Sequence, residues 1–359
     1  MALGTVGTTQ ISNEVFQANR NIVRNGAMEV HQRGGTITAA AGNYCLDRFQ
    51  IWDNGDGGFD VSQSTTAPAG FKNSLKVDVT SADTSIASDA YKLLYYRMEG
   101  VDAVGLNAGT SDAVTVTISF YVRSNVTGNH SFGIRNDNAD RAYFALYNIS
   151  AADTWERKSI TIPFVTTGTW PTTTAGCMSL IFSFASGSDF VVTSNNAWES
   201  ANKIQAANAV NLFSSASNDW YMTGLQMEIG EVATPFERER YDTTLVKCQR
   251  YYYKVEHSYG SIDIGAGLET TTTQARIFVP FPVEMRSHAT AVETSSTAGN
   301  FDITHNNSVL ISNAVPTYSN ANRTGASVFF AHASGGTAGQ GCTGRLRVAG
   351  TYLAWKAEV

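Results

Sequence analysis

The sequence of 359 residues is 43% hydrophobic and 16% charged, and its net charge at pH 7 is −6. This length predicts two or three domains, each large enough to bury a core. The acidic balance, without any basic run longer than two residues, argues against a surface that follows nucleic-acid phosphates, and no apolar segment approaches the roughly 20 residues that span a bilayer.

The four cysteines are far apart and have no CxxC spacing, and the six histidines are equally scattered. A zinc site is therefore disfavoured, because structural zinc uses closely spaced Cys and His pairs. We predict four buried free thiols, with a disulfide network as the alternative. The cysteines are Cys45, Cys177, Cys248 and Cys342.

Residues 1–20 are polar and too few to fold alone. They contain the start of one predicted short helix, SNEVFQANRNI, with Ser12 as its N-cap. The first residues lack the basic and apolar regions of a secretory signal, so we expect a soluble protein that is made in a cytosol. We predict that residues 1–20 are an attachment arm that docks on a partner, with a flexible tail as the alternative.

Residues 21–238 contain a series of segments in which apolar and polar residues alternate. In AVTVTISFYVRS, Val116, Ile118 and Phe120 alternate with Thr and Ser. This period of two is typical of strands with one buried face. The same pattern occurs in residues 74–81, 157–164, 177–186 and 224–231.

The segments between these strands are rich in Asn, Asp, Gly, Ser and Thr, which favour turns. Only KLLYYRMEG (92–100) and ANKIQAANAV (201–210) indicate short helices. Many strands at this density, without long helices, predict an all-β fold in which residues 21–238 form a two-sheet sandwich.

A charged connector, residues 239–250, follows the sandwich. Asp242 can cap a short helix that runs to Lys247 or Cys248. Strand patterns then resume in RYYYKVEH, QARIFVPFPVEM, ASVFFAHAS and RLRVAGTYLAWKAEV. Residues 251–359 are thus predicted to form a smaller antiparallel β domain. Its many polar, glycine-rich loops leave little core for a monomer, so we infer that it associates with copies of itself.

Three consecutive tyrosines, Tyr251, Tyr252 and Tyr253, stand at the start of this domain. Successive side chains of a strand point to opposite faces, so three bulky residues in a row predict a strand that is covered on both faces. Tyrosine combines a large apolar area with a hydroxyl group that can stay hydrated, which suits a junction. We predict that these residues lie where domains and neighbouring subunits meet.

Two tryptophans lie in loop-like segments, Trp170 in TGTWPTTT and Trp198 in NNAWESANK. Sugars present apolar C–H faces and hydroxyls, so a glycan site needs an exposed aromatic ring beside amides or carboxylates. Asn196 and Glu199 supply such groups next to Trp198, and these four residues form the candidate glycan site. Packing of both rings beneath a loop is the alternative. The other tryptophans follow strand patterns and are predicted core residues: Trp52, Trp155, Trp220 and Trp355.

Two turn-like segments, WDNGDGGFD and RNDNAD, are dense in the oxygen ligands that Ca²⁺ accepts. Their carboxylates, the candidate ligands of a structural calcium, are Asp53, Asp56, Asp137 and Asp140. Plain turns are the alternative, because EF-hand spacing is absent. No other cofactor is expected.

Catalysis has little support in the sequence. A glycosidase needs two carboxylates roughly 5–9 Å apart, and the same aspartates could supply a pair only from Asn- and Gly-rich turns. The sequence has no GxSxG motif, phosphate-binding loop or dinucleotide fingerprint. We therefore predict that the protein is not an enzyme.

Four blocks of sequence carry a resemblance. NGAMEVHQRGG followed by NYCLDRFQIW resembles the opening of a jelly-roll module of bacteriophage tail-fibre and other virion proteins. GLQMEIGEVATPFERERYDTTLVKCQRYYYK is similar to the end of that module and its junction to a C-terminal β domain. VPFPVEMRSHATAV and YLAWKAEV resemble the two ends of that domain. The resemblance implies a jelly roll like those of carbohydrate-binding modules, and a homotrimer.

The resemblance and the residue patterns together predict a non-enzymatic bacteriophage virion protein, made in the host bacterial cytoplasm. As a tail fibre it would attach to other virion proteins through residues 1–20 and contact a host-surface polysaccharide. Two alternatives stay open: a capsid fibre or decoration protein without a receptor role, and a polysaccharide depolymerase. Neither nucleic acid nor a membrane is an expected partner.

Overall fold

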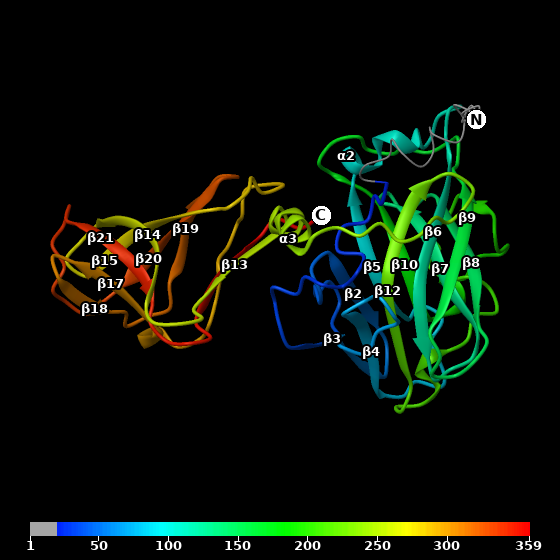
Figure 1. The fold of residues 1–359 in the computed structure, drawn as a ribbon, viewed down its shortest axis with the longest axis horizontal. Helices are drawn as coiled ribbons and strands as arrows, with labels where there is room; N and C mark the ends of the chain where they lie inside the picture. The colour runs from blue at the N-terminus through cyan, green and yellow to red at the C-terminus, as the bar shows by residue number, and fades with distance from the viewer. Residues whose placement is uncertain (1–19) are drawn as a thin grey trace, which may run out of the picture. The chain divides into compact units, whose positions relative to one another are not determined.

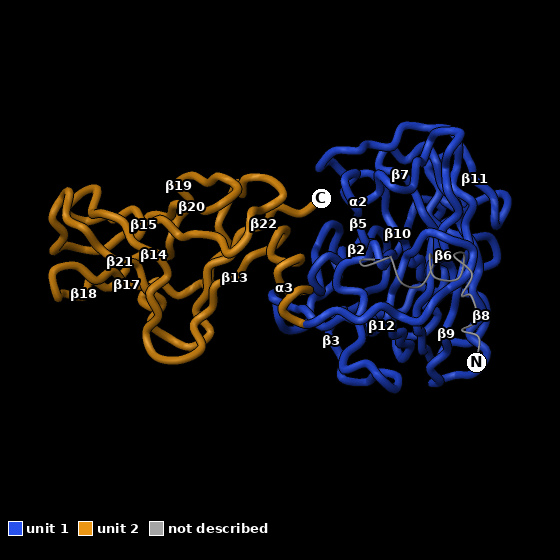
Figure 2. Tube along the Cα trace, turned by 45° about the horizontal axis from the view of Figure 1, so that its top comes forward, with its two compact units in different colours: residues 1–240 blue, residues 241–359 orange. Residues whose placement is uncertain are grey.

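The computed structural model describes residues 20–359, which divide into two compact units (Figure 2). The N-terminal unit ends at Arg240, and the C-terminal unit begins at Tyr241. The predicted arm up to residue 19, with most of the helix predicted from Ser12, lies outside the described residues. Within residues 20–359, no helix is long and apolar enough to cross a membrane.

The N-terminal unit is built from two antiparallel six-stranded sheets (Figure 1). Sheet A contains, in spatial order, β1 (Thr36–Thr38), β3 (Gly58–Ser64), β4 (Ser74–Ser81), β12 (Asp219–Ile229), β6 (Thr115–Ser124) and β9 (Glu156–Pro163). Sheet B contains β11 (Trp198–Glu199), β8 (Ala142–Ile149), β7 (Gly128–Asn136), β10 (Gly176–Ser186), β5 (Tyr91–Glu99) and β2 (Phe49–Asn54). The connections include α2 (Gly100–Ala103) and the 3₁₀ turns η1 (Val104–Leu106), η2 (Ser188–Phe190) and η3 (Leu212–Ser214).

The main core of this unit lies between the two sheets. Val116, Ile118 and Phe120 of β6 are fully buried, as their alternation with Thr and Ser predicts. The ring centroid of Phe120 lies 5.1 Å from that of Phe182 in β10, so the rings of the two sheets interdigitate. The all-β jelly-roll sandwich predicted for this part of the chain is confirmed.

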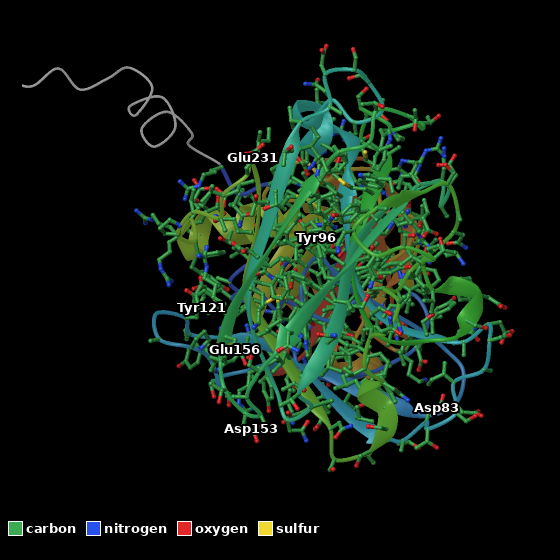
Figure 3. The ribbon with its side chains drawn as sticks, turned by 90° about the vertical axis from the view of Figure 1, so that its right-hand side faces the viewer. Asp83, Tyr96, Tyr121, Asp153, Glu156 and Glu231 are labelled. Atoms are coloured by element: carbon green, nitrogen blue, oxygen red, sulfur yellow. The ribbon has the colours of Figure 1, made fainter. Side chains whose placement is uncertain are left out.

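Both predicted helices inside the sandwich are wrong. Residues 92–99 belong to strand β5, which pairs with β10 on one side and β2 on the other. Its two faces are both apolar: Tyr96, labelled in Figure 3, is 2% exposed in the main core, and Tyr95 faces the opposite side of the sheet. Residues 201–210 contain no helix and run as an irregular segment.

That irregular segment covers part of the outer face of sheet B. Residues 187–210, here named the covering segment, pack Val192 and Ile204 onto Leu93, Ile181 and other outward side chains of the sheet. Hydrogen bonds hold it there: the Ala206 N–H donates to Ser131 Oγ at 2.9 Å, and Ser183 Oγ lies 2.8 Å from Gln205 Oε1. The covering segment thereby creates a second, smaller apolar core outside the sandwich.

The C-terminal unit is the smaller antiparallel β domain that the sequence predicts. It begins with α3 (Tyr241–Gln249), which has Asp242 in its first turn. A three-stranded sheet contains β13 (Tyr252–Glu256), β22 (Tyr352–Lys356) and β16 (Glu293–Thr294). A seven-stranded sheet contains, in spatial order, β18 (Ser308–Ile311), β17 (Phe301–His305), β21 (Gly341–Leu346), β14 (Ile262–Glu269), β15 (Gln274–Pro280), β20 (Gly325–Ala331) and β19 (Thr317–Ala321). The turn η4 (Ala298–Asn300) precedes β17.

The three consecutive tyrosines have different surroundings. Tyr253 stacks on Trp355 of β22 with ring centroids 6.0 Å apart, and the Tyr252 hydroxyl donates to Glu293 at 3.2 Å. Tyr251, which precedes β13, is buried. The predicted subunit or domain junction at Tyr251, Tyr252 and Tyr253 stays a prediction.

All four cysteines are free and buried, which confirms the prediction of buried free thiols. Burial raises the pKa of the Cys45 and Cys177 thiols to about 12 and that of Cys342 to about 11. A thiol with such a pKa is almost entirely protonated at neutral pH, and the thiolate is the reactive form.

We expect Ellman's reagent at pH 8 to modify none of the four thiols in the folded protein, because all four are buried. After unfolding in guanidinium chloride, all four react. The absorbance of the released thionitrobenzoate measures both counts. A thiol that reacts within seconds in the folded protein would contradict this arrangement.

Candidate functional site

The structure brings Trp170 and Trp198 together. Their ring centroids are 5.8 Å apart with the rings at 89°, and both contact Phe164, which is buried. The indole N–H of Trp170 donates to the Thr167 carbonyl at 3.1 Å, and that of Trp198 to the Pro163 carbonyl at 2.8 Å. Both half-buried rings therefore pack against the main core, and their indole N–H groups are already used in hydrogen bonds to backbone carbonyls.

The two polar residues beside Trp198, Glu199 and Asn196, differ in their hydrogen bonds and in their exposure. Glu199 Oε1 accepts hydrogen bonds from the backbone N–H and the hydroxyl of Thr193 and from the N–H of Ser194. Burial raises the pKa of Glu199, but these hydrogen bonds outweigh it and lower the pKa on balance. Asn196 is exposed and adopts a left-handed backbone conformation with φ of 62°. Glu199 thus fixes a turn, and a glycan contact at these residues stays a prediction.

The candidate calcium ligands pair with protein groups in this structure. Asp53 forms an ion pair with Lys92 at 2.8 Å, and Asp137 pairs with Arg97. Asp140 Oδ1 accepts a hydrogen bond from the Asn136 amide. Asp56 is exposed. Within residues 20–359, no group of three or more His, Cys, Asp or Glu side chains is placed to hold a metal ion, and the calcium site stays a prediction.

The tryptophans predicted as core residues divide into two pairs. Trp220 and Trp355 are fully buried, which confirms the prediction. Trp52 and Trp155 are only half-buried, so the prediction is wrong for them. Both belong to outer faces: Trp155 contacts Tyr221 of sheet A, and Trp52 contacts Tyr95 of sheet B.

Trp52 lines a pocket at the margin of the covering segment. The pocket has a volume of about 170 Å³ and is here named the aromatic pocket. Its lining residues are Trp52 of β2, Tyr91 and Tyr95 of β5, Arg135 of β7, and Phe190, Asn202 and Ile204 of the covering segment. Because side chains of a strand alternate, Trp52, Tyr95 and Arg135 all stand on the outer face of sheet B.

The aromatic walls of the pocket are fixed by their neighbours. The ring of Trp52 lies 6.0 Å from that of Tyr95 at an interplanar angle of 39°. The Trp52 indole N–H donates to Gln50 at 2.9 Å, and the Gln50 amide donates in turn to the Gly42 carbonyl at 3.0 Å. Tyr91 meets Phe190 edge to face at 5.5 Å. These contacts hold the rings in place without a ligand.

One cation faces this aromatic surface. The guanidinium of Arg135 lies 5.6 Å from the centre of the Tyr95 ring, and its Nη1 donates to the Asn202 side-chain oxygen at 2.7 Å. Burial raises the pKa of Tyr95 to about 12, although Arg135 and Arg97 lower it. The Tyr95 hydroxyl therefore stays protonated at neutral pH.

The pocket combines the features of a saccharide subsite. Aromatic faces suit the C–H faces of a sugar ring, and guanidinium and amide groups suit its oxygens. Its volume is below the range of about 300–1,000 Å³ of pockets that enclose drug-sized ligands, so it fits one sugar residue better than a whole oligosaccharide.

No protein-family model and no curated protein matches the sequence. Solved structures match with low identity. The enzymatically active domain of tailspike protein 4 of bacteriophage CBA120 is 12% identical at a TM-score of 0.32, covering 59% of this chain and 22% of its own. The CBM22-1 xylan-binding domain of Paenibacillus barcinonensis Xyn10C is 13% identical at 0.28, covering 56% and 97%.

The family 11 carbohydrate-binding module from Clostridium thermocellum, in complex with a β-1,3-1,4-mixed-linked tetrasaccharide, is 13% identical at a TM-score of 0.29 and covers 56% of this chain and 98% of its own. Likenesses of this degree concern the β-sandwich and assign no ligand.

The sequence contained a signal for the pocket that the analysis of isolated motifs missed. In β5, Tyr91, Leu93 and Tyr95 alternate with a second apolar series, so both faces of this strand are apolar. A strand of this kind must be covered on both sides, and Trp52 on the neighbouring strand shares its outer face.

Replacing Trp198 with alanine should destabilise the N-terminal unit by about 2–3 kcal/mol, because the ring fills space against Phe164, Trp170 and Tyr143. Urea unfolding followed by tryptophan fluorescence measures this loss. Trp155→Ala, which removes a half-buried ring with one aromatic neighbour, serves as the control and should cost less. Unchanged stability in Trp198→Ala would show that this ring is not a packing residue.

Proposed function

We propose that the protein is a non-enzymatic glycan-binding protein of a bacteriophage particle, in which the aromatic pocket binds one residue of a host-surface polysaccharide. The observation that carries the glycan part is the presence, in one pocket, of fixed aromatic rings and of polar groups that can bond to sugar oxygens. The part that concerns the particle rests on the four sequence blocks that resemble tail-fibre and other virion proteins.

A tail fibre that contacts the host is the form of this proposal that we favour, since receptor binding requires a ligand site. A capsid fibre or decoration protein would not need the pocket. The depolymerase alternative has less support, because none of the residues that line the pocket is Asp or Glu, and glycoside hydrolysis usually uses two carboxylates.

The proposal includes a homotrimer formed through the C-terminal unit. Apolar side chains stand on the outer face of its seven-stranded sheet: Leu268 is 43% exposed and Phe278 is 44% exposed. Ala266 pairs with Phe278 in the register of β14 and β15, and Leu268 lies two residues after Ala266 on the same strand. Leu268 and Phe278 therefore stand on the same face of the sheet. A further copy of the chain would remove this apolar area from water.

Replacing Trp52 with alanine should weaken polysaccharide binding at least tenfold, which corresponds to about 1.4 kcal/mol, because the largest aromatic wall of the pocket is lost. Binding is measured on an array of bacterial capsular and O-antigen polysaccharides and then by titration calorimetry on those retained by the unmodified protein.

The matched control for Trp52→Ala is Trp155→Ala, which removes a half-buried tryptophan from the outer face of sheet A and should leave the affinity unchanged. Equal losses in both variants would contradict a site at the aromatic pocket. Release of reducing ends from a bound polysaccharide, abolished by Asp137→Asn, would instead support the depolymerase.

The trimer predicts a solution mass of three times the 38.6 kDa of one chain at micromolar concentration. Phe278→Asp should shift the protein towards single chains, because a charge would be buried at the interface. Val232→Asp, at an apolar residue that is 74% exposed in the N-terminal unit, is the control and should leave the mass unchanged. Mass photometry and sedimentation velocity measure both. A folded, unmodified protein that sediments as a single chain would overturn the trimer.

A further inference from the structure

We propose that the aromatic pocket selects a sugar residue that carries a carboxylate, such as a uronic acid. This inference rests on the proposed glycan-binding function and names the chemical class of the ligand. It follows from the state of Arg135, the charged residue among those that line the pocket.

Arg135 has hydrogen-bonding capacity that the protein does not use. A guanidinium carries five N–H donors and can hold a carboxylate through two parallel hydrogen bonds. In residues 20–359, Arg135 forms one side-chain hydrogen bond, from Nη1 to Asn202, and no ion pair. Its Nε is shielded from solvent and has no acceptor in the structure.

Arg123 of sheet A is a cation whose charge is paired within this protein. Arg123 also lies over a tyrosine ring, with 4.9 Å to the centre of Tyr221, but it forms ion pairs with Asp153 at 2.6 Å and Asp219 at 3.9 Å. Asp153, which precedes β9 in the sequence, is labelled near the lower edge of Figure 3. Arg123 therefore has its counter-ions within the chain, whereas Arg135 has none in the part of the chain that the structure describes.

The charges around the pocket are arranged unevenly. Arg97 and Arg135 both pair in register with Ser179 of β10, so the two arginines occupy one row across three strands. Arg97 is paired with Asp137, which leaves Arg135 as the uncompensated cation of this row. The row thus favours an anion beside Arg135.

The other residues that line the pocket are uncharged, and Tyr91 and Phe190 meet edge to face among them. A sugar bound across Tyr95 would thus be oriented with its carboxylate towards Arg135, the charged residue of the lining.

A neutral sugar would bind less well for a definite reason. Binding of an uncharged sugar residue would remove water from the Arg135 guanidinium without providing a counter-charge. A carboxylate would replace that water with charge-assisted hydrogen bonds. The protonated Tyr95 hydroxyl and the Trp52 ring would contact either sugar equally, so the discrimination belongs to Arg135.

The test compares uronic-acid-containing bacterial polysaccharides with the same polysaccharides after carbodiimide and borohydride reduction, which turns each carboxylate into a hydroxymethyl group and keeps ring and linkage. We expect the unmodified protein to bind at least one native polymer tenfold or more tightly than its reduced form. Arg135→Met should abolish this difference, whereas Arg123→Met, the matched control on sheet A, should preserve it.

The outcomes separate this inference from the function on which it rests. Equal affinity for native and reduced polymers, lost in Trp52→Ala, would overturn acid selection and leave glycan binding intact. Absence of binding to every polymer, native, reduced or neutral, would overturn the proposed function itself. The comparison of native and reduced polymers uses the unmodified protein, so it decides the inference even if Arg135→Met fails to fold.

Discussion

Sheet B is apolar on both of its faces, and this constraint organises the N-terminal unit. In β5, Leu94 and Tyr96 point into the main core, while Leu93 and Tyr95 point away from it. The central strand β10 repeats the arrangement, with Ile181 on the outer face. A sheet of this kind cannot leave its second face in water without exposing a large apolar area. The chain must therefore supply a cover.

The covering segment meets that need only in part. It is too irregular to pair as a strand along its length, so two hydrogen bonds anchor it to the sheet, one that the Ser131 hydroxyl accepts and one that the Ser183 hydroxyl donates. Where the cover ends, Phe190 and Ile204 form one wall of the aromatic pocket, and Trp52 and Tyr95 remain beside them. The pocket is thus a consequence of incomplete coverage, and its rigidity comes from the same contacts that stabilise the fold.

Much of the fold could be predicted from the sequence, because strands such as β4 and β6 have one apolar and one polar face. The same reasoning failed at β5. A short run that is apolar on both faces has no period of two, and it resembles a helical segment when only local sequence is considered. Tertiary pairing with β10 and β2 decides its structure, and that information is not local.

The candidate site could be predicted less well. Trp170 and Trp198 attracted attention because polar residues surround them in the sequence, yet their rings pack on Phe164 and their N–H groups bond to backbone carbonyls. Trp52 was assigned to the core because it follows a strand pattern. A strand residue next to a turn can face outward as easily as inward, and only the register between β2 and β5 shows which face it shares with Tyr95.

The outer faces of sheets A and B differ in whether the cations beside their aromatic rings form ion pairs. Sheet A also displays an aromatic pair, Trp155 and Tyr221, but Arg123 and Lys76 beside Tyr221 form ion pairs with carboxylates of the same chain. The charges beside this aromatic pair are already paired within the chain, so a charged ligand would add little there. The pocket on sheet B places fixed rings beside a guanidinium that has no counter-ion among residues 20–359, so an anionic sugar would provide an interaction that this part of the chain does not. Because an unpaired charge beside apolar surface is costly to keep and favourable to satisfy, the difference between Arg123 and Arg135 supports the proposal of a site on sheet B rather than on sheet A.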